Sequence, residues 1–130
     1  MMGGSLAGTD KRFRTFVLIC GLEGFVRHFT LSQHPSIVRA RNSTKAEDFK
    51  RLLAAMEPID AKKFIGRSSV PLLFQAARFD LGVSESDTRD YFAMAAEPKE
   101  LKWYDSGHDL NDPQAFVDRQ SWLRKYLNIQ

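Results

Sequence analysis

What this sequence has little of excludes several classes of protein. It contains a single cysteine, Cys20, so no disulfide can form within the chain. No apolar run is long enough to cross a bilayer, which takes about 18 residues or more. The first residues, Met1 to Ala7, lack the basic and long apolar regions of a signal peptide. We therefore expect a soluble protein of a reducing, cytoplasmic compartment, with no membrane partner.

The chain also lacks a large excess of either charge. The chain has 19 Lys and Arg against 16 Asp and Glu, a net charge of +3, and the two signs alternate along its whole length. Without a basic patch, nucleic acid is not an expected partner. No Gly-rich phosphate loop follows any apolar run, which argues against a nucleotide-binding domain. His28 and His34 have no third ligand at metal spacing, so we expect neither a metal nor another cofactor.

What is present is core material and one recurring pattern. The 130 residues are 43% hydrophobic, which suffices for one domain with a buried core. Apolar runs of strand length are followed by turns and then by helical periodicity, the pattern of parallel strands joined by crossover helices. Asp112 and Pro113 mark the start of the last helix, and Ser84 or Ser86 can cap the one before it. We predict an α/β fold with three parallel strands near 14–20, 70–79 and 100–104 and helices near 85–96 and 113–127.

The connection between the first two strands is too long for a simple crossover. Thr44 and Glu47 have the spacing of a capping box, and apolar residues then recur at helical spacing up to Pro58. This predicts a helix near 45–56, and a second, short helix can run from Asp60 to Gly66. Because ligands of open α/β sheets bind at the carboxyl ends of the strands, we interpret 21–69 as a helical cap insertion over that edge.

Polar residues with catalytic chemistry follow the second and third strands. Asp80 comes directly after the second apolar run, and His108 lies in the loop that leaves the third. Neighbouring strands lie about 4.8 Å apart, so these loops can bring a carboxylate and an imidazole into hydrogen-bonding contact. Such a pair orients the ring and stabilises its protonated form. Asp105 and Asp109 flank His108 and compete with Asp80 for the role of the acid.

Several segments together resemble one family. The string 78–83, Arg-Phe-Asp-Leu-Gly-Val, resembles the acid turn of α/β-hydrolases, and Ser106-Gly107-His108 resembles their histidine turn. Segments 6–13 and 56–67 are similar to the dienelactone-hydrolase and esterase branch. The resemblance covers essentially the whole chain and implies the C-terminal part of an α/β-hydrolase fold. It implies that Asp80 and His108 are the acid and the histidine of a catalytic triad, whose nucleophile comes earlier in chain order.

The nucleophile is the missing member. An elbow of the form Gly-x-Ser-x-Gly sits between a strand and a helix, and only the segment around Ser5 comes close to it. Ser5 has no strand before it, so we do not expect it to be the nucleophile. The resemblance instead places Met1 to Ala7 in the helix after the elbow, with the serine upstream. It divides the chain into 1–20 (the end of that helix and the first strand), 21–69 (cap insertion) and 70–130 (acid and histidine strands with the final helix).

Two hypotheses about function follow. The first is the C-terminal portion of a serine-type hydrolase that cleaves a carboxylic ester or related acyl bond of a small molecule and is inactive as this isolated chain. The alternative is a non-catalytic remnant or interaction module of the same fold. In either case the first strand has an unpaired edge, so we expect Phe16 and Leu18 to be accessible and the chain to self-associate through that edge.

Overall fold

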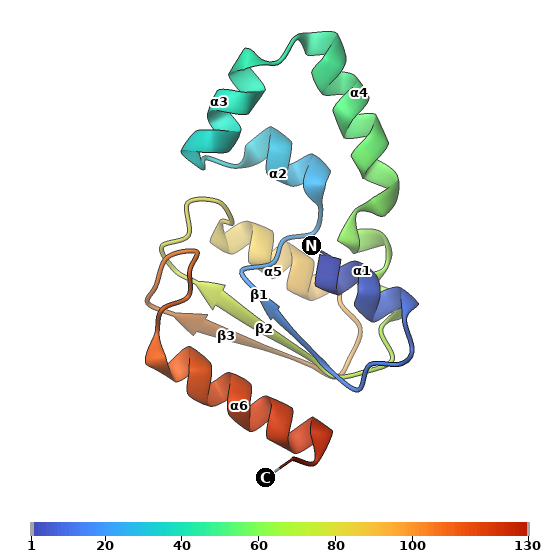
Figure 1. The fold of residues 1–130 in the computed structure, drawn as a ribbon, viewed down its shortest axis with the longest axis vertical. Helices are drawn as coiled ribbons and strands as arrows, with labels where there is room; N and C mark the ends of the chain where they lie inside the picture. Colours follow the sequence, from blue (N-terminus) through green and yellow to red (C-terminus); the bar gives the residue numbers. More distant parts are fainter. Residues whose placement is uncertain (1, 130) are drawn as a thin grey trace.

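The protein is built on a three-stranded parallel sheet. The computed structural model describes residues 2–129, and the strands lie in the order β1-β2-β3 (Figure 1). Leu18 of β1 is in register with Phe74 of β2, which is in register with Leu101 of β3. Both pairings are parallel, as predicted from the sequence. The strands are β1 (Phe16–Ile19), β2 (Leu72–Ala77) and β3 (Lys99–Tyr104).

Helices cover both faces of this sheet. One buried cluster joins α1 and α5 to side chains of β1 and β2, including Leu18 and Phe74. A second cluster joins α6 to the other face through Ala77, Tyr104 and Ala115. None of the helices described in residues 2–129 is long and apolar enough to cross a membrane. The helices that cover the sheet are α1 (Met2–Thr9), α5 (Glu85–Met94) and α6 (Pro113–Leu127).

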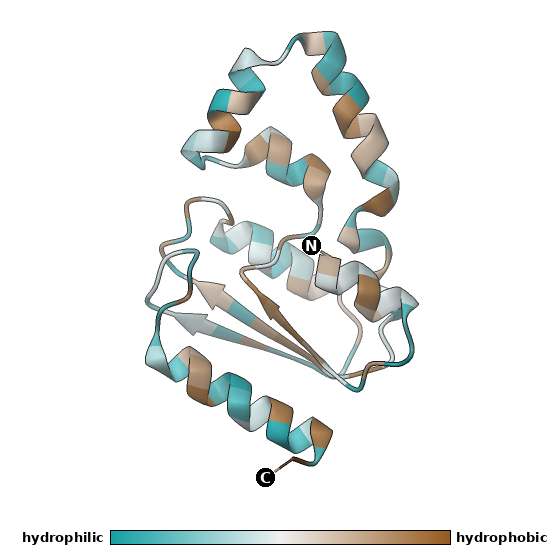
Figure 2. Ribbon diagram, viewed as in Figure 1, coloured by the Kyte–Doolittle hydropathy of each residue, from teal (hydrophilic) through white to brown (hydrophobic). Residues whose placement is uncertain are grey.

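β2 is the best-buried element. All six of its residues are buried, because it pairs on both edges and is covered on both faces. The Phe74 ring meets Tyr91 and Phe92 edge to face, at centroid distances of 5.4 and 5.3 Å. Apolar residues are concentrated in β1 and β2 (Figure 2). The sheet thus provides a rigid platform at whose carboxyl edge the loops begin.

The connection from β1 to β2 is helical and stands beyond the carboxyl ends of the strands (Figure 1). We refer to α2, α3 and α4 as the cap helices. The helix at the position of α4 was predicted, whereas α2 and α3 were not. The predicted short helix from Asp60 is divided into two 3-10 turns. The elements are α2 (Phe25–Leu31), α3 (Pro35–Ser43), α4 (Ala46–Met56), η1 (Glu57–Ile59), η2 (Ala61–Lys63) and η3 (Ile65–Arg67).

Polar contacts fix the start of the cap. The fully buried Asp60 carboxylate accepts the backbone N–H of Phe25 at 2.7 Å and so caps α2 from a distant part of the chain. A Cβ atom at Gly24 would lie 2.2 Å from the Asp60 Cγ atom, so only glycine allows this approach. Arg27 of α2 forms ion pairs with Asp87 and Asp90 of α5. The cap is therefore tied to the sheet-covering helix by charge as well as by the chain.

The predicted capping box at Thr44 is wrong. The residue that caps α4 is Lys45, and it makes no side-chain capping bond. Thr44 Oγ1 instead donates to the carbonyl of Ala40 at 2.7 Å, back toward the preceding helix. The prediction failed because the sequence analysis did not identify α3. That helix ends next to Thr44, and the carbonyls of its last turn are free to accept the Thr44 hydroxyl. The capping box of the structure lies at Ser84 and Asp87, at the start of α5.

The expected exposure of Leu18 is also wrong. Leu18 is only 7% exposed, because α1 packs over it, and Phe16 is half-buried. The exposed side chain of the strand is Ile19, at 42%. Among residues 2–129, β1 pairs only with β2, so its other backbone edge is available. Self-association through that edge stays a prediction. It would depend on hydrogen bonds from the unpaired backbone groups of β1 and not on contacts of Leu18.

Candidate active site

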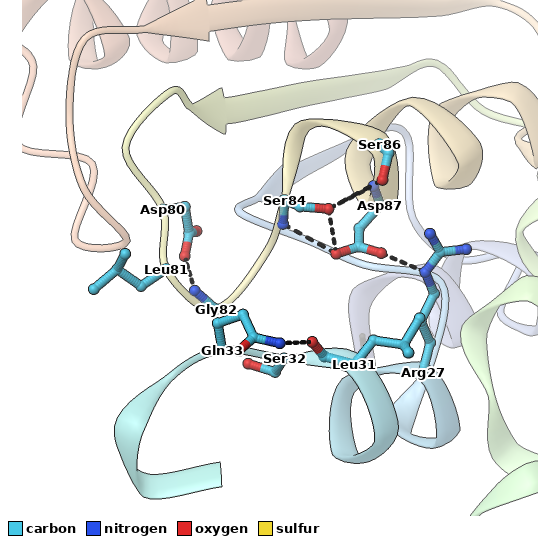
Figure 3. A pocket seen from close by; sticks show the side chains of 10 residues that line it. All are labelled: Arg27, Leu31, Ser32, Gln33, Asp80, Leu81, Gly82, Ser84, Ser86 and Asp87. Atoms are coloured by element: carbon cyan, nitrogen blue, oxygen red, sulfur yellow. Dashed lines mark hydrogen bonds and ion pairs between the residues drawn. The ribbon is translucent and has the colours of Figure 1, made fainter. Parts of the chain in front are cut away.

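The Asp80 carboxylate lies in the turn that follows β2. Its Oδ1 atom accepts the backbone N–H of Gly82 at 2.8 Å (Figure 3). It also accepts the backbone N–H of Val83 at 3.0 Å. The side chain is only 1% exposed. Two backbone donors fix one carboxylate oxygen and leave the other, Oδ2, directed elsewhere. The turn therefore holds a buried carboxylate in one orientation.

His108 lies in the loop after β3 and meets this carboxylate. Its Nδ1 atom is 2.8 Å from Asp80 Oδ2, the hydrogen-bonding contact expected from the sequence, and its side chain is 66% exposed. The loop is anchored by Leu110, which adopts a left-handed φ of 49° and is 2% exposed. The contact predicted between Asp80 and His108 is thus confirmed, while their catalytic roles stay a prediction.

The competing carboxylates do not hold the ring. Asp105 is 74% exposed and pairs with Arg78 at 3.0 Å. Asp109 accepts a hydrogen bond from the side chain of Asn111. Of the three carboxylates considered from the sequence, only Asp80 contacts His108.

Ser5 does not lie at a strand-to-helix turn. It is part of α1, and its Oγ donates weakly to the carbonyl of Ile59 at 3.4 Å. Within the described residues no strand precedes α1. The position of Ser5 is that of an ordinary helical residue and not of a nucleophile elbow.

Cys20 joins the pair, which the sequence did not predict. It follows β1 directly and is 7% exposed, and one ligand atom each of Cys20, Asp80 and His108 lie within 4.8 Å of one another. Burial raises the pKa of the Cys20 thiol to about 12, and the negative charge of Asp80 contributes. The thiol is thus buried and protonated at neutral pH, which argues against Cys20 as the nucleophile.

All three histidines of the chain line one cavity. The cavity has a volume of about 200 Å³ and lies between the cap and the Asp80 turn. Burial lowers the pKa of His28, and the nearby His108 and His34 lower it further. His28 Nδ1 is buried without a hydrogen-bond partner among the described residues. The lining residues are His28, His34, Ser36, Ile37, Gly82 and His108.

A second cavity, of about 310 Å³, borders the other side of the Asp80 turn (Figure 3). Its lining comes from α2 and the residues after it, including Arg27 and Leu31, and from the segment between Asp80 and Asp87. The Arg27 guanidinium is paired with Asp87, so its positive charge is already balanced within the cavity. Asp80 therefore lines one cavity and His108 the other, and residues of the cap border both.

No family model and no curated protein sequence matches the chain. Solved structures do match. An acetyl xylan esterase from Paenibacillus sp. superposes with a TM-score of 0.71 at 20% identity, covering 95% of this chain and 42% of that one. An enol-lactonase from Burkholderia xenovorans gives 0.59 at 15% identity (98% and 62%). An α/β-hydrolase from Penicillium sp. gives 0.63 at 16% identity (98% and 60%).

These neighbours share one architecture, and each is longer than this chain. The chain is covered almost completely, yet it spans only 42% to 62% of the three structures. The chain therefore has the α/β-hydrolase fold and forms a part of it.

Proposed function

We propose that this chain supplies the acid and the base of a serine-type hydrolase that cleaves a carboxylic ester or related acyl bond. The observation that carries the proposal is the 2.8 Å contact between His108 Nδ1 and the buried Asp80 carboxylate. The fold of the chain and the names of its neighbours, an esterase and a lactonase, support acyl chemistry. The nucleophilic serine and the oxyanion donors would lie in a part of the polypeptide outside these 130 residues.

In this mechanism Asp80 accepts the Nδ1–H of His108 and leaves Nε2 as the basic atom. Nε2 takes the proton of the serine hydroxyl as the serine oxygen attacks the acyl carbon, and the buried carboxylate stabilises the imidazolium that forms. The imidazolium then gives the proton to the leaving alcohol. A water molecule repeats both steps on the acyl-enzyme and releases the acid.

The first test is the isolated chain. A carboxylate and an imidazole without a positioned serine and oxyanion donors retain little transition-state stabilisation. We expect no hydrolysis of p-nitrophenyl acetate above that of free imidazole, and no labelling by a serine-directed phosphonate. Stoichiometric labelling of Ser5 would contradict the placement of the nucleophile.

The second test is the chain extended by the coding sequence upstream of Met1. We expect that sequence to contain an in-frame Gly-x-Ser-x-Gly after an apolar strand. In the extended protein, D80N should lower kcat by about 10⁴-fold and H108Q by at least about 10³-fold. The matched control is D105N, an exposed carboxylate near the histidine loop, which should leave kcat within about twofold. An upstream sequence without an elbow favours the alternative, a non-catalytic module.

A further inference from the structure

The carboxyl ends of all three strands deliver one metal-binding side chain each to the same point. Cys20 follows β1, Asp80 follows β2, and His108 follows β3. Because the strands are parallel and adjacent, these ends meet at one edge of the sheet. A thiol, a carboxylate and an imidazole are the three side-chain types that bind zinc in proteins. The convergence is a property of the fold, since the three residues are far apart in sequence.

The distances suit a small divalent ion. One ligand atom from each residue lies within 4.8 Å of the other two. In a tetrahedral zinc site, ligand atoms about 2.0 to 2.3 Å from the metal are roughly 3 to 4 Å from one another. A separation of 4.8 Å would therefore shorten by about 1 to 1.5 Å around the ion, whereas the 2.8 Å contact between Asp80 Oδ2 and His108 Nδ1 would widen. Three protein ligands leave the fourth position to water.

The surroundings of the three side chains favour a positive ion and leave it a path from the solvent. The Asp80 side chain is 1% exposed, and both the imidazole of His108 and the thiol of Cys20 lie beside it. A buried carboxylate gains from a cation that binds it directly. Cys20 is buried, whereas the His108 side chain is 66% exposed. An ion can therefore reach the three side chains from the solvent side of His108.

We propose that Cys20, Asp80 and His108 bind a Zn²⁺ ion. The soft thiolate of Cys20 selects zinc over magnesium or calcium, which prefer oxygen ligands alone. The Cys20 thiol gives up its proton to solvent when the Zn–S bond forms, and His108 binds as the neutral imidazole, with its proton on the ring nitrogen that does not bind the ion. A consequence rests on the function proposed above: the bound ion occupies the acid and the base, so zinc inhibits the complete hydrolase.

Cobalt(II) is the probe that tests the site on the full chain, because a cobalt–thiolate bond absorbs in the near ultraviolet. We expect one equivalent of Co²⁺ to produce this band and one equivalent of Zn²⁺ to remove it. C20A should abolish the band. H108Q should weaken binding by more than the roughly 10–100-fold that follows loss of a group outside the ligand shell. H34Q, which removes a histidine from the same cavity, is the matched control and should bind like the wild type.

The far-ultraviolet circular dichroism and urea midpoint of C20A show whether it is folded, and C20S provides a second, polar replacement. Binding without a thiolate band, or equal affinity in wild type and folded C20A, overturns the site. Inhibition is measured separately on the extended, elbow-containing protein with p-nitrophenyl acetate. If zinc binds the chain but leaves that activity unchanged, the consequence fails while the metal site stands.

Discussion

The sheet and the cap are stabilised in different ways. All residues of β2 are buried, and its apolar side chains pack against helices on both faces. None of the residues of α2, α3 or α4 is fully buried. The cap is joined to the body by polar contacts, such as Asp60 with Phe25 and Arg27 with Asp87. We infer that Asp80 and His108 stand on the apolar, well-packed part, whereas the space around them is bounded by the part that opens more easily.

The largest effect is expected where the sheet is best packed. F74A removes a ring that is 2% exposed and contacts Tyr91 and Phe92, so it should cost about 3–5 kcal/mol of unfolding free energy. Urea denaturation followed by circular dichroism measures this loss. F116A removes a ring that is 54% exposed on α6 and should cost about 0.5 kcal/mol or less. Equal losses in the two variants would contradict the assignment of the core.

A smaller effect is expected at the anchor of the cap. D60A leaves the backbone N–H groups at the start of α2 without their acceptor, which should cost about 1–3 kcal/mol. The loss should be local, so hydrogen exchange should accelerate at Phe25 and Val26 before it does so in β2. D48A, which removes an exposed carboxylate of α4, is the control. Acceleration in β2 to the same degree would show that the cap and the sheet open together.

The smallest effect concerns pH. Because burial lowers the pKa of His28 below its ordinary value of 6.5, the unfolded chain binds this proton more readily than the folded one. Stability from this group is therefore complete above pH 6.5 and is lost as pH falls toward the lower, folded value. H28Q should remove that part of the pH dependence, as read from urea midpoints at pH 7.5 and 5.5. Solvent screening keeps the effect small, and identical profiles for wild type and H28Q would contradict it.

The sheet and its covering helices were predictable because their signals are local. A continuous apolar run indicates a strand buried on both faces, as β2 is, and Asp112 with Pro113 marks the start of α6. The start of α2 has no such signal, since its cap, Asp60, is distant in sequence. Pro35 at the first position of α3 was a signal that could have revealed that helix.

The residues of the candidate site were predictable where the sequence analysis looked at the residues that follow a strand. Asp80 and His108 were found because each follows an apolar run, and the structure brings them together. The same rule applied to the first strand would have included Cys20, which follows β1 directly. The gathering of His28 and His34 at His108 depends on the fold of the cap and could not be read from spacing.

The most direct test of the central claim is the protonation of the His108 ring, observed by nitrogen-correlated NMR of the purified chain at neutral pH. If Asp80 orients the ring, His108 carries its proton on Nδ1, and this proton is shifted downfield by the 2.8 Å contact. The signal should be lost in D80N and retained in D105N and D109N. A proton on Nε2 instead, or a signal that survives in D80N, would contradict the assignment of Asp80 and His108 as acid and base.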